Sequence, residues 1–138
     1  MSGFLLDANV ISEPTRPKAE PKVLEWIRST DERLLYLSVL TLGEIRKGIG
    51  LHPDRGRRVK LEAWLAGELL PRFSGRILTV DENVADRWGQ ITAEVGQPVS
   101  VIDALLAATA LEHNLTLVTR NTQDVAALPV STFNPWLG

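Results

Sequence analysis

The 138-residue sequence predicts a single-domain α/β/α sandwich, built around a central and mainly parallel sheet of four or five strands. Short apolar runs alternate with stretches of helical periodicity along the chain, which is typical of an α/β protein. Strands that alternate with helices favour a parallel sheet with both faces covered and right-handed crossovers. No repeat, low-complexity tract or linker interrupts residues 1–138, and this length suits one domain.

Five short apolar runs are the expected strands. The first three are Phe4–Leu6, Leu34–Ser38 and Arg76–Val80. The fourth is Leu115–Thr119, and Val130–Phe133 is expected as a short strand at the sheet edge. In open parallel sheets, ligands bind beyond the carboxyl ends of the strands, so candidate functional residues are sought there.

Apolar residues recur at helical spacing in five segments between these strands. The first expected helix begins at Pro21, the second ends near Gly50 and Pro53, and the third stops at Pro71. The fourth has Asp81 as its N-cap and is broken at Gly96–Pro98. The fifth is the segment Val101–Leu111. Proline ends a helix because it lacks an N–H donor and clashes with the preceding turn. Because Val101–Leu111 is the most apolar segment, we expect it to be central.

Composition and charge narrow the classes of function. The formal net charge of −2 gives no overall nucleic-acid signal. The chain has no cysteine, which excludes disulfides, zinc–thiolate sites and a thiol nucleophile. No apolar run reaches the roughly 18–20 residues that span a bilayer, and the N-terminus lacks the pattern of a signal peptide. We therefore expect a soluble, cytoplasmic protein with no membrane contact.

Four acids stand near expected strand ends or helix starts, namely Asp7, Glu44, Asp103 and Asp124. Each alone has a structural explanation, because Asp is a frequent N-cap and Thr41–Glu44 has the spacing of a capping box. Together they would project from one end of the sheet, where carboxylates repel and raise one another's pKa. A divalent cation removes that repulsion, and a capping acid can also be a metal ligand.

An all-oxygen donor set of this kind favours Mg²⁺ or Mn²⁺. Such an ion can polarise a phosphate and activate a water, so the acids are candidates for phosphodiester hydrolysis. His52 and His113 stand at expected helix ends, where structural roles explain them. No Walker or GxGxxG sequence is present, which argues against nucleotide binding by those loops.

Basic residues gather in one helix–loop–helix region, and their members are Arg46, Lys47, Arg55, Arg57, Arg58 and Lys60. Two interpretations stay open, a solvated helix face or a local positive surface that contacts an RNA backbone. Trp136, in the closing "FNPW", also has two interpretations. It either packs the tail back onto the domain or joins a partner interface.

The acidic motifs resemble those of PIN-domain ribonucleases. "LLDANVISE" is similar to their opening strand followed by D-x-N, and "LSVLTLGEIRKGI" to their second acidic motif. "DALLAATALEHNLTLVTRN" resembles the third motif and "TRNTQD" the fourth. "ISEPTRP", "LPRFSGRIL" and "FNPW" most resemble the FitB-like branch of VapC toxins. One departure is Val125, which follows the fourth acid where the family usually has an aromatic residue.

The resemblance implies a PIN-like fold, Mg²⁺- or Mn²⁺-dependent endoribonuclease activity, and toxin action in a bacterial type II toxin–antitoxin pair. It makes Asp7 and Asp103 the principal metal ligands, with Glu44 and Asp124 completing the catalytic acidic site directly or through water. Asn9, Thr119 and Asn121 would be supporting polar residues that orient the acids. Relatives form homodimers and bind a small DNA-binding antitoxin whose tail covers the active site.

Two other classes of function stay open at this point. A phospho-acceptor signalling domain also gathers acids around Mg²⁺, but it commonly has adjacent acids after its first strand and a lysine late in the sheet. Here Asp7 stands alone and the late segment has Arg120. A D-x-D phosphatase is excluded because position 9 is Asn9. A non-catalytic module that binds RNA or a partner is the other alternative.

Overall fold

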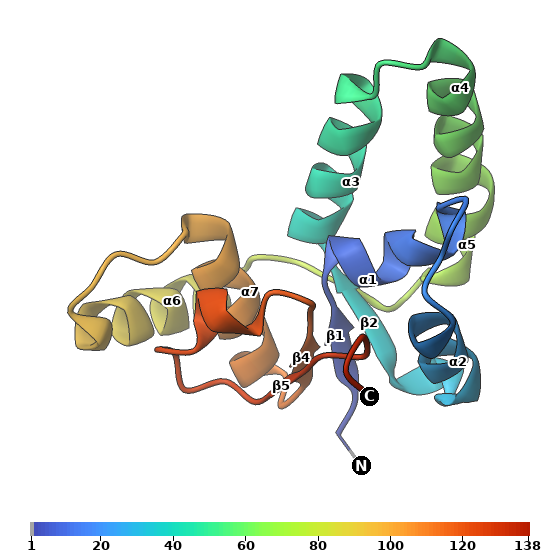
Figure 1. Ribbon diagram of the computed structural model, residues 1–138. Coiled ribbons are helices and arrows are strands. Elements are labelled where there is room, and N and C mark those ends of the chain that lie inside the picture. Colours follow the sequence, from blue (N-terminus) through green and yellow to red (C-terminus); the bar gives the residue numbers. More distant parts are fainter. Residues whose placement is uncertain (1) are drawn as a thin grey trace.

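The computed structural model describes residues 2–138 and contains a five-stranded, all-parallel sheet in the order β3-β2-β1-β4-β5 (Figure 1). The strands are β1 (Phe4–Leu6), β2 (Leu35–Ser38), β3 (Ile77–Leu78), β4 (Thr116–Val118) and β5 (Thr132–Phe133). The α/β fold and all five expected strands are confirmed, although every strand after the first is shorter than expected. β5 forms one edge of the sheet, as predicted.

Helices fill the connections between the strands. They are α1 (Ala8–Ser12), η1 (Glu13–Thr15), α2 (Pro21–Ser29), η2 (Glu32–Leu34), α3 (Val39–Leu51), α4 (Arg55–Trp64), η3 (Leu65–Leu69), α5 (Leu70–Arg72), α6 (Glu82–Val95), α7 (Val101–Glu112) and η4 (Thr122–Val125). Gly96 ends α6 with a positive φ of 70°, where a glycine is favoured. Among residues 2–138, no helix has both the length and the apolar character needed to cross a bilayer.

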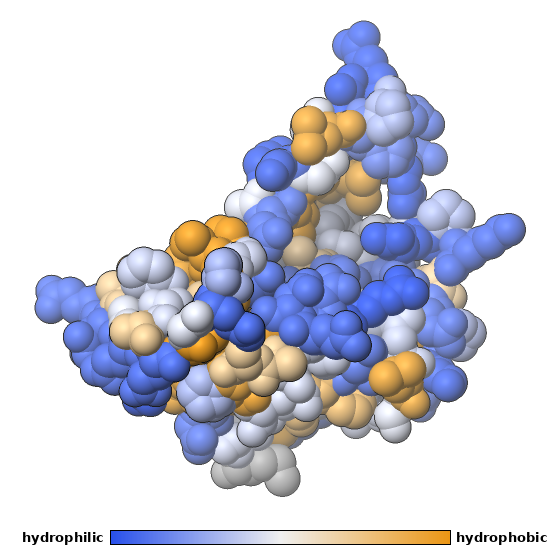
Figure 2. Space-filling view, turned by 60° about the vertical axis from the view of Figure 1, so that its left-hand side comes forward, coloured by the Kyte–Doolittle hydropathy of each residue, from blue (hydrophilic) through white to orange (hydrophobic). Residues whose placement is uncertain are grey.

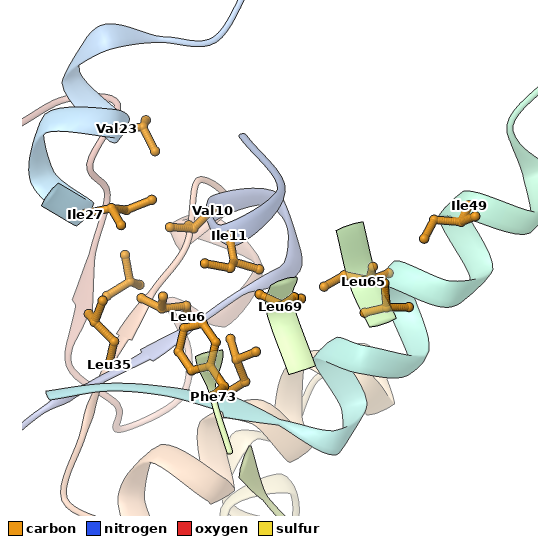
Figure 3. Close-up of a cluster of buried hydrophobic side chains, with 13 residues drawn as sticks. Leu6, Val10, Ile11, Val23, Ile27, Leu35, Ile49, Leu65, Leu69 and Phe73 are labelled. Atoms are coloured by element: carbon orange, nitrogen blue, oxygen red, sulfur yellow. The ribbon is translucent and has the colours of Figure 1, made fainter. Parts of the chain in front are cut away.

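Both faces of the sheet are buried under helices. Leu5 and Leu6 are consecutive in β1 and point to opposite faces, so each joins a different buried cluster. The cluster that contains Leu6 includes side chains from α1, α2, α3 and η3, with Phe73 fully buried among them (Figure 3). The cluster that contains Leu5 is built largely from the alanine-rich α7, which confirms that Val101–Leu111 is central.

The predicted helix stop at Pro71 is wrong. The helix that begins as α4 continues through η3 and α5 to Arg72, with Pro71 inside it. η3 is a π-helical turn in which the N–H of Leu70 donates to the carbonyl of Leu65. Such a turn widens the helix, and it stands directly before Pro71, whose ring would otherwise clash with the preceding turn. The chain therefore passes the proline without ending the helix.

Helices α3 and α4 form a hairpin that projects from the sheet as an arm (Figure 1). Leu51 and Val59 stand on this arm with 73% and 61% of their surfaces exposed. The space-filling view shows hydrophobic residues among hydrophilic ones on the arm (Figure 2). The arm forms one wall above the carboxyl edge of the sheet, where the candidate site lies.

An ionic cluster joins the segment before β2 to the segment before β3. The Glu32 carboxylate lies 2.8 Å from Arg72 Nη2 and 2.7 Å from Arg76 Nη2. Both guanidinium groups also stack on the buried Phe73 ring, at 5.2 and 4.8 Å from its centroid. Hydrogen bonding from Arg72 and then from Arg76 holds the pKa of Glu32 below its ordinary value of 4.5, although burial of the group opposes this. The cluster thus favours the ionised carboxylate.

We expect Glu32→Gln to lower the free energy of unfolding at neutral pH by at most about 1 kcal/mol, because the Glu32 side chain is 45% exposed and solvent screens it. Because the pKa of Glu32 is lower in the folded state than in the unfolded state, its ionised carboxylate stabilises the fold. This contribution to the free energy of unfolding is complete above pH 4.5 and is lost as the pH falls through the folded-state pKa. Urea unfolding of both proteins across acidic pH measures this. Glu25→Gln, which removes an exposed partner of Arg28, is the control and should change little. A difference that grows as the pH falls would contradict the assignment.

Candidate active site

The carboxyl edge of the sheet opens into a cavity of about 830 Å³ between α1, η1 and the α3–α4 arm. Three of the four predicted acids line it, namely Asp7, Glu44 and Asp103. Two of the predicted supporting residues, Asn9 and Asn121, line it as well. Residues from four separate segments of the sequence therefore meet at the edge where the parallel-sheet rule places a ligand.

Asp7 is held by contacts from three directions. Its backbone N–H donates to the carbonyl of Val118 in β4 at 2.9 Å, which continues the parallel ladder by one residue. Its Oδ1 accepts from the N–H of Ala8 at 2.8 Å, so Asp7 is the N-cap of α1. Its Oδ2 accepts from the hydroxyl of Thr119 at 2.8 Å. The carboxylate is therefore fixed in orientation, and the cap does not prevent it from facing the cavity.

Thr119 connects two segments of the site. It is only 3% exposed, and its hydroxyl accepts from the N–H of Asn121 at 3.1 Å while donating to Asp7. The hydroxyl thus sets both the direction of the Asp7 carboxylate and the path of the chain towards Asn121. The geometry agrees with the supporting role that the resemblance implies for Thr119.

Glu44 is not part of a capping box, so the structural explanation offered by the Thr41–Glu44 spacing does not hold. The N-cap of α3 is Ser38, whose hydroxyl accepts from the N–H of Leu40 at 3.0 Å. α3 begins three residues earlier than that pair required, and Thr41 is buried against the carbonyl of Leu6 at 3.4 Å. Glu44 lies in the second turn of α3 and needs another explanation than a cap.

Asp103 stands between two cavities. It lies in the first turn of α7, whose N-cap is Ser100, and it also lines a second cavity of about 460 Å³. Asp124, an exposed residue of η4, lines only this second cavity. Asp103 is therefore the acid that lines both cavities, whereas Asp7 and Glu44 line only the first.

The carboxylates act on one another electrostatically. Burial raises the pKa of Glu44 above its ordinary value, and the negative charges of Asp7 and Asp103 raise it further, while Lys47 opposes them. Burial also raises the pKa of Asp103, followed by the charges of Asp124 and Asp7, against a hydrogen bond from Ser100. This mutual repulsion is the behaviour expected of acids that share one site in the absence of a cation.

The donor set fits a hydrated Mg²⁺ or Mn²⁺ better than a metal enclosed by protein. Within residues 2–138, no three acidic or histidine side chains come close enough to form a ready-made metal cluster. Mg²⁺ commonly takes one or two carboxylates and keeps several waters, so it does not need such a cluster. Asn9 Oδ1 is buried beside the acids and accepts no hydrogen bond from the described residues. It is a neutral oxygen that a water or a cation could use.

The predicted basic residues lie on the arm and differ in their surroundings. Arg57 points to the opposite wall of the cavity, where its Nη2 donates to the carbonyl of Thr15. Arg46 and Lys47 are exposed on α3, two and three residues after Glu44. Arg55, Arg58 and Lys60 follow on α4. The structure therefore gives Arg57 a structural contact, whereas RNA contacts by the others stay a prediction.

Glu13 supports the cavity wall through Arg16, although no sequence pattern pointed to this residue. This acid is only 5% exposed, and its Oε2 accepts from the N–H of Glu20 at 2.8 Å. Its Oε1 lies 3.4 Å from Nε of Arg16, a residue that lines the cavity. Because an acid before a proline is typical of an exposed loop, no local sequence pattern predicted that Glu13 would be buried.

Comparison with known proteins agrees with this geometry. Residues 4–128 match the family model described as the PIN domain. The chain is 41% identical over 136 residues to Toxin FitB of Neisseria gonorrhoeae, covering 96% of this chain and 98% of the relative. It is 34% identical over 136 residues to VapC ribonuclease Y4jK of Sinorhizobium fredii, covering 96% and 97%.

Solved structures agree as well. The crystal structure of FitAcB from Neisseria gonorrhoeae superposes with a TM-score of 0.91 at 40% identity, over 96% of this chain and 98% of that one. A structure of FitAB bound to the IR36 DNA fragment superposes with a TM-score of 0.90 at 39% identity, over 96% and 95%. Because both sequence and fold match over nearly the whole length, the chain belongs to the PIN-domain family, among the ribonuclease toxins represented by FitB and VapC.

Proposed function

We propose that this protein hydrolyses phosphodiester bonds in RNA as a Mg²⁺- or Mn²⁺-dependent endoribonuclease, with Asp7, Glu44, Asp103 and Asp124 as its catalytic acids. The observation that carries the proposal is the fixed Asp7 carboxylate at a cavity where Glu44 and Asp103 have raised pKa values. Carboxylates held against their own repulsion are poorly explained as caps alone, because a cap needs only one of them.

Each residue has a separate task in this proposal. Asp7 and Asp103 would hold the ion, with Glu44 and Asp124 completing the donor set directly or through water. The bound ion would polarise the scissile phosphate and lower the pKa of a water. Thr119 and the N–H of Ala8 keep the Asp7 carboxylate in one orientation, and Asn9 and Asn121 offer neutral polar groups beside it. The protein thereby supplies fixed negative charge where the cation is needed.

We also propose that residues 1–138 form one PIN domain, which acts as a homodimer and as the toxin of a pair in the bacterial cytoplasm. Its partner would be a small DNA-binding antitoxin whose tail enters the cavity. Apolar side chains of Ile45, Ile49, Leu61 and Trp64 line the arm side of this cavity, which suits a peptide better than a fully hydrated ligand. A related toxin has been solved as FitAB on a DNA fragment, which supports a DNA-binding partner here.

Two observations argue against the phospho-acceptor signalling domain. Both oxygens of Asp7 accept hydrogen bonds, which leaves this acid less free than a phospho-acceptor needs to be. The family match also favours the nuclease over a signalling domain. A non-catalytic binding module would keep the fold and bind RNA or a partner, and it is separated from the nuclease by the substitutions below.

We expect Asp7→Asn and Asp103→Asn each to reduce RNA cleavage to below about 1% of the original rate, because an amide cannot supply the negative charge that the ion requires. The measurement is cleavage of RNA by purified protein with Mg²⁺ or Mn²⁺. Asp86→Asn is the matched control, since this acid is exposed on α6 and, among residues 2–138, accepts a hydrogen bond from Gln90 alone. Cleavage at the original rate after either site substitution would show that the acids are not catalytic.

Thr119→Val should lower kcat about 10- to 100-fold, because it removes the donor to Asp7 while keeping the shape of the side chain. It should also lower the free energy of unfolding by about 1–3 kcal/mol, since the N–H of Asn121 loses its acceptor. Thr119→Ser retains the hydroxyl and should restore most of the activity. Kinetics and urea unfolding together measure this, and equal kcat values for the valine and serine variants would refute a positioning role.

A further inference from the structure

Arg120 and the C-terminal tail form a structure that the proposed mechanism does not yet use. Arg120 follows the buried Thr119 and precedes Asn121, so its Cα lies about 3.8 Å along the chain from two residues of the site. Its neighbour Thr119 bonds Asp7, whereas Arg120 itself is exposed. A cation thus stands one residue away from both Thr119 and Asn121.

The tail holds this arginine in place through Asn134 and Trp136. Asn134 Nδ2 donates to the backbone carbonyl of Arg120 at 3.2 Å, and Asn134 Oδ1 accepts from the N–H of Trp136 at 2.9 Å. The Arg120 guanidinium carbon lies 5.1 Å from the centroid of the Trp136 ring. Trp136 itself packs against the buried cluster that contains Leu6. The tail is therefore folded back onto the domain, and it orients Arg120 as it does so.

The guanidinium is oriented but not neutralised. Within residues 2–138, the Arg120 side chain takes part in no ion pair and no side-chain hydrogen bond, although four acids stand at the same edge. Stacking on an indole covers one face of a guanidinium and leaves its N–H edge to solvent. That edge is suited to the two oxygens of a phosphate.

We propose that Arg120, held against the Trp136 ring, binds a backbone phosphate of the RNA strand next to the bond that is cut. The inference rests on the proposed RNA cleavage and adds a substrate-binding residue to it. An acidic site repels a polyanion, so a fixed cation one residue from Thr119 and Asn121 would attract the RNA backbone and offset part of this repulsion. A phosphate contact of this kind is independent of the base sequence.

The test is RNA binding in an Asp103→Asn background, which prevents cleavage, with Mg²⁺ and a short labelled single-stranded RNA at several salt concentrations. Arg120→Gln should raise Kd about fivefold and reduce the slope of log K against log salt by about 0.7, the value for one phosphate contact on a single strand. Arg33→Gln is the matched control, because this exposed arginine precedes β2 and so lies at the amino ends of the strands, away from the candidate site. It should leave both quantities unchanged.

Further variants of Trp136 and Arg120 distinguish loss of the phosphate contact from loss of folding. Trp136→Leu should weaken RNA binding in the same direction as Arg120→Gln, whereas Trp136→Phe keeps a ring under the guanidinium and should bind almost normally. Arg120→Lys keeps the charge without the planar fork and should fall between the parent and Arg120→Gln. Thermal unfolding of each variant shows whether the domain remains folded. In the catalytically intact chain, Arg120→Gln should raise KM with kcat unchanged, which is the sign of uniform binding.

Each contrary outcome has a defined meaning. An unchanged Kd and salt slope would overturn the proposal, as would a higher Kd with an unchanged slope, since that result would mean contact with a base instead of a phosphate. Normal RNA binding with weaker antitoxin binding would assign Arg120 to the partner interface and also overturn it. Failure of the parent chain to bind or cut RNA would instead refute the proposed function. Cleavage by the parent chain with no effect at Arg120 would refute this inference alone.

Discussion

The hydrogen bond from Thr119 to Asp7 is the contact on which the arrangement of the candidate site depends. It joins the neighbouring parallel strands β1 and β4, because Asp7 directly follows β1 and Thr119 directly follows β4. The same aspartate begins α1 through the N–H of Ala8, so one side chain links the sheet, a helix and the cavity. Helix capping and metal binding were two compatible explanations of Asp7. The geometry shows the cap, and we propose that the same carboxylate also binds the ion.

Carboxylate repulsion is the cost of this arrangement. Burial and neighbouring acids raise the pKa values of Glu44 and Asp103, which means that the folded chain holds these groups in a less favourable environment than water. The rest of the fold must offset that cost, and the two buried clusters on either side of the sheet provide the stabilisation. A site that is unfavourable by itself and becomes favourable with a bound cation is a common property of functional centres.

The sequence allowed the strands and the order of helices to be predicted, because apolar periodicity is a local pattern. It also placed the acids near strand ends, and three of the four line one cavity, whereas their catalytic roles stay a prediction. It failed where the outcome depended on distant contacts. Pro71 was expected to end a helix, and only the π-helical turn before it lets the helix continue. Thr41 resembled a cap, but it lies inside α3 and packs against the carbonyl of Leu6 in β1. Glu13 and the pairing of Arg120 with Trp136 likewise involve side chains whose partners no local pattern reveals.

Whether these acids together bind a divalent cation can be measured without RNA, by calorimetric titration of the metal-free protein with MnCl₂. We expect saturable binding to the original chain and its loss in Asp7→Asn and in Asp103→Asn, with binding retained in the Asp86→Asn control. Equal Mn²⁺ affinity in all four proteins, or no binding to the original chain, would show that the acids do not form a cation site.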